Sequence, residues 1–337
     1  GLYACLVSGS ACIVKPHAKA VLPIAIVIEE LQKVLQENGF DSNTVQMAID
    51  SMSSPITKEL AENPAIKQID FTGNSEFGNY IESLPKTSFT EKAGVNSIIL
   101  DSVNDMKAVA GNIAFSASLY SGQMCTAPQN IFIAESGVKT AEGHLSFEEV
   151  VNSLKDGFNG LIDHPKAGPG TLGAIQAEAT YKRVQDLNAS NHKLLVPSKS
   201  IVNEEFKDAR IASPVVIELN ENDADLYNHE CFGPVVFIIK TKNLQDSIDK
   251  AVSLASQKGA LTCGAYTTHE ESRILIEDAM NQIYVPVSFN FTGAGFINSH
   301  AAFSDFHLSG GNAAGNASFT NADFINRRIV WVGNRYM

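Results

Sequence analysis

Charged side chains are scarce in this chain, and basic ones are scarcer than acidic ones. Only 18% of the 337 residues are Asp, Glu, Lys or Arg, and the formal charge is −12. A disordered chain combines low hydrophobicity with a high charge density, whereas 44% of these residues are hydrophobic. The acidic balance argues against nucleic-acid binding, which requires a basic surface. We therefore expect a globular protein of about two domains.

Long apolar runs and cysteine pairs are also missing. The longest apolar run near the N-terminus, residues 20–28, contains Pro23 and ends at Glu29, and a membrane span needs roughly 20 apolar residues. No two of the five cysteines form a Cys-x-x-Cys pair, so neither a disulfide framework nor a structural zinc site is expected. We expect free thiols, no bound metal, no membrane segment and a cytoplasmic location.

The first ninety residues alternate strand and helix signals. Short apolar runs predict strands at 11–14, 45–49 and 69–72. Helical spacing over 20–37 stops at Asn38-Gly39, and a second helix is expected between the last two strands. Strands separated by helices favour parallel pairing in an α/β sheet.

From about residue 93 a second α/β unit is expected. Strands are predicted at 97–100, 130–133, 214–219, 235–239, 262–265 and 285–289, with helices at 105–119, 146–161 and 272–281. Residues 310–316 are rich in Gly, Ala and Asn and indicate a loop. Residues 328–332 indicate a last strand.

Residues 168–173, Gly-Pro-Gly-Thr-Leu-Gly, match the G-x-G-x-x-G pattern of dinucleotide-binding proteins. That fingerprint requires a strand before it and an acidic residue about 20 positions after it. The preceding segment 163–166 cannot be a buried strand, and position 193 is Lys. We interpret the match as a solvent-exposed turn.

Cys125 differs from the other cysteines in its setting. It lies in segment 121–128, Ser-Gly-Gln-Met-Cys-Thr-Ala-Pro, between a predicted helix and a predicted strand. A nucleophilic cysteine needs partial exposure and N–H donors that favour the thiolate, and a loop supplies both. The alternative is a small buried side chain, as expected for Cys12 and Cys263 inside apolar runs.

Three further segments carry candidate binding groups. Residues 71–78 end a strand and open a helix, so their N–H groups can face a pyrophosphate. Glu91 stands at the expected boundary between the two units, and Glu230 and Phe232 come just before a predicted buried strand. Taken singly, these segments are equally compatible with a helix cap, a solvated acid and a turn.

Together, in this order, the segments resemble those of the NAD(P)-dependent aldehyde dehydrogenases. The resemblance covers the whole chain but only the later portion of the family. It implies that Cys125 is the nucleophile and that Glu91, 34 positions before it, is the general base. Hydride would pass to the cofactor, and Glu91 would then activate water to hydrolyse the thioester.

The resemblance also implies cofactor contacts. Lys15 matches the lysine at the adenosine ribose, and Gly73 and Asn74 match the turn beside the phosphates, with Asn74 in place of a usual serine. Glu230 matches the acid that holds the nicotinamide ribose, and Phe232 the ring that packs on nicotinamide. The implied fold is an incomplete Rossmann-type nucleotide-binding domain (1–92), an α/β catalytic domain (93–310) and a C-terminal loop and oligomerisation strand (311–337).

Segments 90–96, 119–125 and 302–307 resemble the branch known from phenylacetic acid degradation, the PaaN proteins. That branch implies aromatic catabolism and oxidation of a CoA-linked semialdehyde. The resemblance also implies that the chain is a fragment, because the family's oxyanion-hole asparagine would precede its first residue. Ala18 stands where NAD-preferring members often have glutamate, and His17 and Lys19 are adjacent, so the cofactor is NADP or NAD.

Two other functions remain open. The chain could keep the fold only for assembly, without catalysis. A cysteine hydrolase would instead need a histidine beside Cys125, and none is close in sequence. Residues 326–332 include Trp331, the only tryptophan, and this apolar strand is expected to pair with another subunit in a homo-oligomer, a dimer or larger.

Overall fold

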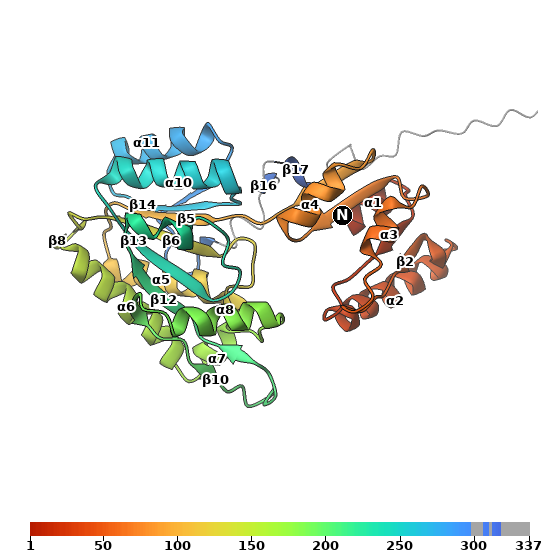
Figure 1. Ribbon diagram of the computed structural model, residues 1–337, viewed down its shortest axis with the longest axis horizontal. Coiled ribbons are helices and arrows are strands. Elements are labelled where there is room, and N and C mark those ends of the chain that lie inside the picture. The colour runs from red at the N-terminus through yellow and green to blue at the C-terminus, as the bar shows by residue number, and fades with distance from the viewer. Residues whose placement is uncertain (298–305, 310–311, 318–337) are drawn as a thin grey trace, which may run out of the picture. The chain divides into compact units, whose positions relative to one another are not determined.

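The computed structural model describes residues 1–297, 306–309 and 312–317. Helices and strands alternate along these residues, as expected of an α/β protein (Figure 1). Contacts divide the chain into two compact units. The N-terminal unit comprises residues 1–90, to which the described residues from Ala314 also belong, and the second unit is Glu91–Ala313.

The N-terminal unit contains two small sheets, in which β1 pairs with β2 in parallel and β3 pairs with β4. The predicted strands and the helix over 20–37 are confirmed to within two residues at each end. Pro23 lies in the first turn of α2, where its missing N–H has no partner in any helix. The elements are α1 (Leu2–Val7), β1 (Cys12–Val14), α2 (Val21–Glu37), η1 (Ser42–Thr44), β2 (Val45–Met47), α3 (Thr57–Glu62), β3 (Gln68–Thr72), α4 (Ser75–Glu82) and β4 (Thr87–Glu91).

The second unit is built on a seven-stranded sheet in the order β15-β14-β5-β6-β13-β12-β9. Neighbouring strands are parallel, except that β9 runs antiparallel to β12. The sheet strands are β5 (Asn96–Leu100), β6 (Pro128–Ala134), β9 (Lys193–Val196), β12 (Val215–Leu219), β13 (Val235–Thr241), β14 (Cys263–Tyr266) and β15 (Val287–Phe289).

Helices and short strand pairs connect these strands. The helices are α5 (Met106–Ser118), η2 (Leu119–Gly122), α6 (Phe147–Asp163), α7 (Ala167–Thr171), α8 (Glu178–Asn188), η3 (Glu221–Asp223), α9 (Ala224–Tyr227), α10 (Leu244–Lys258) and α11 (Glu270–Asn281). The remaining strands are β7 (Val138–Thr140), β8 (Gly143–Leu145), β10 (Ser200–Ile201), β11 (Ile211–Ala212), β16 (Phe306–Ser309) and β17 (Asn312–Ala317), which pair as β7-β8, β10-β11 and β16-β17.

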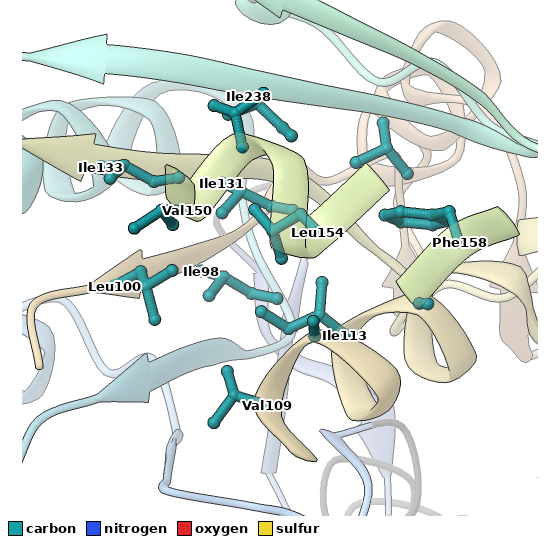
Figure 2. Packing of buried hydrophobic residues seen from close by; sticks show 14 of the residues in the cluster. Ile98, Leu100, Val109, Ile113, Ile131, Ile133, Val150, Leu154, Phe158 and Ile238 are labelled. Atoms are coloured by element: carbon teal, nitrogen blue, oxygen red, sulfur yellow. The ribbon is translucent and has the colours of Figure 1, made fainter. Parts of the chain in front are cut away.

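Successive side chains of the central strands enter two different apolar clusters. Ile98 of β5 belongs to the cluster with α5 and α6, whereas Ile99 belongs to the cluster with α8, α10 and α11. Figure 2 shows Ile98, Ile131 and Leu154 packed in the first cluster. A parallel sheet covered on both faces explains why these strands are continuous apolar runs in the sequence.

Two loop assignments from the sequence are wrong. Residues 168–173 do not form a solvent-exposed turn. Residues 168–171 belong to α7, and Gly168, Thr171 and Leu172 are buried. The glycine at 168 allows close packing, since a Cβ there would lie 2.7 Å from the Ile162 carbonyl oxygen. Residues 312–317 form strand β17 instead of a loop, because pairing with β16 outweighs the weak β-propensity of Ala, Asn and Gly.

Other expectations concern residues outside the described ranges, among them the strand at 326–332 and Trp331. Within the described part, no helix is long and apolar enough to cross a bilayer. The described side chains also contain no cluster of three or more His, Cys, Asp or Glu residues that could hold a metal ion.

Candidate active site

The loop that carries Cys125 leaves α5 through an unusual turn. Tyr120, Ser121 and Gly122 have φ values of 53°, 57° and 61°, so three consecutive residues lie in the left-handed region. Non-glycine residues rarely adopt this conformation and need support from their surroundings. Ser121 has that support, because its buried hydroxyl donates to the Gly173 carbonyl at 2.9 Å.

Gln123 fixes the same loop from its other side. Its Nε2 donates to the carbonyl oxygens of Tyr120 (3.0 Å) and Ala174 (2.9 Å), and its Oε1 accepts from the Gln176 N–H at 3.0 Å. The segment around Gly173 that mimics a dinucleotide fingerprint is therefore a structural support of the cysteine loop.

Cys125 lies at the opening of a small pocket between the amino ends of β5, β6 and β13. Glu230 and Phe232 line this pocket together with Cys125. Cys125 is exposed, whereas Cys231 and Cys263 are buried and Cys5 and Cys12 are intermediate. The structure thus brings together three of the predicted site residues, and the alternative of a buried Cys125 is wrong.

The surroundings of the Cys125 thiol favour its protonated form. Partial loss of water around the thiol, and the carboxylates of Glu91 and Glu230, raise its pKa to about 12. Glu91 is close enough to the thiol to raise its pKa, whereas the backbone N–H of Cys125 lowers that pKa. The expectation that the loop favours the thiolate is therefore wrong for the free protein, because burial of the thiol and the two neighbouring carboxylates all raise its pKa.

Glu91 is nearly buried at the end of β4, with 7% of its surface exposed. Its Oε1 has no hydrogen-bond partner among the described residues, although it is fully buried. A buried, unpartnered carboxylate oxygen is costly and needs an explanation.

The Glu230 segment approaches the pocket from the other side. The Gly94 N–H donates to the Glu230 carboxylate and, with the charge of Arg183, favours its ionised form. Burial is the stronger influence and raises the pKa of Glu230. Arg183 of α8 also donates to the Phe232 carbonyl at 2.7 Å, and the Phe232 residue is 38% exposed.

A separate groove of about 610 Å³ lies within the N-terminal unit and contains the remaining predicted residues. Lys15, Gly73 and Asn74 line it, as do His17 and Phe71. Its volume is within the usual range for small-molecule sites. The groove is therefore large enough for part of a nucleotide.

Two residues of this groove have structural partners, of which the sequence indicated only a helix cap within 71–78, as an alternative. Lys15 forms an ion pair with Asp50, with 2.8 Å between Nζ and Oδ1, and the Asp50 side chain is only 2% exposed. Asn74 caps α4, and its Oδ1 accepts from the Phe77 N–H at 2.8 Å. The other N–H groups of the first turn have no acceptor within the helix, as at any helix start.

Sequence reasoning missed the side chains that hold these loops. Asn96 bonds to the cysteine loop, while Gln129 and Arg183 bond to the Glu230 segment. Gln129 and its neighbour Asn130 were detectable as polar residues inside an apolar strand, since buried amides require hydrogen-bond partners. The ion pair of Lys15 had no comparable signal, because Asp50 lies 35 positions later in a loop.

Nearly the whole chain is similar to known proteins of one family. The model of the aldehyde dehydrogenase family matches residues 1–319. A solved structure described as an NAD-dependent aldehyde dehydrogenase from Burkholderia multivorans is 41% identical, with a TM-score of 0.90 over 97% of this chain and 59% of that one.

More distant relatives extend the comparison. The curated 1-pyrroline-5-carboxylate dehydrogenase of Bacillus cytotoxicus is 26% identical over 91% of this chain and 58% of its own length. The fold also matches an NADP-dependent glyceraldehyde-3-phosphate dehydrogenase from Bacillus halodurans, complexed with NADP, at a TM-score of 0.66 and 24% identity over 86% of this chain and 57% of that one. The chain therefore spans less than three fifths of the length of these relatives.

Proposed function

Because the chain belongs to the aldehyde dehydrogenase family, we propose that it carries out NAD(P)-dependent oxidation of an aldehyde to a carboxylic acid, with Cys125 as nucleophile. The observation that carries the proposal is that Cys125 shares a pocket with Glu230 and Phe232, while the Glu91 carboxylate is near enough to raise the pKa of its thiol. A cysteine can form the thioester, an acid can activate water, and an aromatic ring can pack on a nicotinamide.

Glu91 serves twice in this proposal. It first accepts the proton of the Cys125 thiol, so that sulfur attacks the aldehyde carbon and the carbonyl oxygen gains the negative charge. The backbone N–H of Cys125 is a donor for that oxygen. NAD(P)⁺, when bound, supplies the acceptor for the hydride that leaves the same carbon. Glu91 passes the proton of the thiol to solvent. It then takes a proton from the water that attacks the thioester, and returns that proton to the Cys125 sulfur as the acid leaves.

Each region by itself offers groups that suit one part of a nicotinamide dinucleotide. The N-terminal groove offers the Lys15 ammonium and the free N–H groups at the start of α4, and helix N-termini favour phosphate. In the second unit, the Glu230 carboxylate would accept from ribose hydroxyls and the exposed Phe232 ring would pack on nicotinamide. Relatives dependent on NAD and on NADP both occur, so the proposal includes either cofactor.

Two substrates are proposed for testing. Segments 90–96, 119–125 and 302–307 support a CoA-linked semialdehyde of phenylacetate degradation. The curated relatives named for 1-pyrroline-5-carboxylate support that compound as the second candidate. A cysteine hydrolase is less well supported, because Glu91 and Glu230 are the acids that act on Cys125, while His229 contacts the sulfur of Cys231 at 3.7 Å.

The proposal is tested by incubating the protein with NAD⁺ or NADP⁺ and a panel of aldehydes that includes both candidates. We expect absorbance of the reduced cofactor at one turnover or more per Cys125. The Cys125→Ala variant is the control, and equal reduction by this variant would refute the role of the thiol. A homo-oligomer, dimeric or larger, is also proposed, and light scattering of the intact protein tests it.

A further inference from the structure

A buried carboxamide, Asn96, holds the loop that carries Cys125. Asn96 is the first residue of β5 and is 3% exposed. Its Nδ2 donates to the carbonyl oxygens of Cys125 (2.7 Å) and Ala127 (3.1 Å). Its Oδ1 accepts from the N–H groups of Leu261 (2.9 Å) and Thr262 (3.1 Å). One side chain thus connects the cysteine loop to the segment that enters β14.

A second buried carboxamide, Gln129, holds the segment that carries Glu230. Gln129 lies on the neighbouring strand β6 and is 6% exposed. Its Nε2 donates to the His229 carbonyl at 3.1 Å, and its Oε1 accepts from the Cys231 N–H at 2.6 Å. These two bonds flank Glu230 on both sides, as a neighbouring strand would, and so fix the direction of its side chain.

The sheet explains why side chains make these bonds. In the register of β5 and β6, Asn96 lies opposite Pro128, which has no N–H for the ladder. The amino ends of the two strands therefore lack a regular backbone bond at the place where both loops approach. The amides at this edge supply donors and acceptors in its place.

We propose that Asn96 and Gln129 are positioning residues, and that they set the cysteine loop and the Glu230 segment independently of each other. Each amide bonds to one loop only. Within the described part of the chain, Asn96 forms no hydrogen bond with residues 229–231, and Gln129 forms none with residues 123–127. The contribution of Gln129 to cofactor binding rests on the proposed function, whereas the positioning of both loops does not.

Two cysteines of the chain report on the two loops. Cys125 lies in the loop held by Asn96, and the N–H of the buried Cys231 is bonded to Gln129. The variants Asn96→Leu and Gln129→Met keep side-chain volume and charge but remove the hydrogen bonds. Asn112→Leu is the matched control, because Asn112 is another buried amide (5% exposed) that bonds to Gly295 and Tyr266 instead.

The experiment measures iodoacetamide labelling of each cysteine by peptide mapping at pH 8, together with the melting temperature. Asn96→Leu should speed labelling of Cys125 about tenfold, because a loosened loop lets the thiol leave the carboxylates and one pKa unit is tenfold in thiolate. Labelling of Cys231 should stay within about twofold of wild type. Gln129→Met should instead speed labelling of Cys231 and leave labelling of Cys125 within about twofold of wild type. Asn112→Leu should lower only the melting temperature.

The proposal is wrong if each variant speeds the labelling of both cysteines by the same factor, in proportion to its loss of thermal stability. That result would indicate a general loosening of the fold. If Asn96→Leu does not fold, Asn96→Ser provides the same comparison with a shorter side chain. Fluorescence titration with NADH completes the test, and Gln129→Met should weaken binding about tenfold while Asn96→Leu does not. If the variants show the expected labelling of the two thiols but the wild-type protein binds no NADH, the proposed function alone is contradicted.

Discussion

Replacing Gly122 by alanine tests how the cysteine loop is built into the second unit. A Cβ at this position would lie 2.4 Å from the Gly233 carbonyl oxygen and 2.8 Å from its carbon. Both neighbours are backbone atoms, so no flexible side chain can move aside. The φ of 61° adds the cost of a left-handed alanine.

The expected loss of stability follows from these two costs. Left-handed backbone costs roughly 1–2 kcal/mol for a residue with a Cβ, and overpacking a tight contact costs about 1–3 kcal/mol. Together they predict a loss of about 2–5 kcal/mol in the free energy of unfolding. That is a large part of the roughly 5–15 kcal/mol of an ordinary domain, so the variant should be recovered in lower yield.

Chemical denaturation of Gly122→Ala, followed by circular dichroism, measures this loss. The control is Gly111→Ala in α5, where nothing lies within 4 Å of the added Cβ. That change should be neutral or stabilise by up to about 1 kcal/mol, because alanine is the better helix former. If Gly122→Ala is as stable as wild type, the close approach of the cysteine loop to Gly233 is incorrect.

Three further outcomes are expected. Alkylation of Cys125 should rise with pH to beyond pH 10, since its pKa is raised to about 12; a plateau below pH 9 would contradict this assignment. Glu91→Gln should lower that pKa, because it removes a negative charge beside the thiol. Iodoacetamide at pH 8 should then label Cys125 faster than in wild type, and equal or slower labelling would show that Glu91 does not act on the thiol. The pKa of Asp50 is lowered by Lys15, so this ion pair stabilises the fold above the unfolded pKa of about 4, and its contribution is lost as the pH falls. The free energies of unfolding of Asp50→Asn and wild type should therefore differ at pH 7 and converge at low pH.

The sequence predicted the strands and most helices because their signals are local. Apolar runs such as 97–100 and 235–239 are continuous since both sheet faces are covered, and Asn38-Gly39 ends α2 as expected. The errors at 168–173 and 312–317 arose where burial, or pairing with the preceding strand β16, outweighed local composition. Composition alone shows neither burial nor strand pairing.

The candidate site was predictable in its members but not in its electrostatics. The ordered segments pointed to Cys125, Glu91, Glu230 and Phe232. The structure places Cys125 in one pocket with Glu230 and Phe232, and Glu91 near enough to raise the pKa of its thiol. The raised pKa of the thiol depends on how closely two carboxylates approach it, which spacing along the chain does not contain. Asn96 was missed because its hydrogen-bond partners lie 29 or more positions away, whereas Gln129 had a signal, as a polar residue inside an apolar strand.

A single-turnover experiment tests most directly whether Cys125 and Glu91 act as nucleophile and base. Wild type, Glu91→Gln and Cys125→Ala are each mixed rapidly with aldehyde and NAD(P)⁺, and reduced cofactor and the mass of the intact protein are followed. For Glu91→Gln we expect a burst of up to one equivalent, a depressed steady state and an acyl group retained on Cys125, because water attack needs the base more than hydride transfer does. Loss of the burst together with the steady state, or an acyl adduct on another residue, would contradict the account.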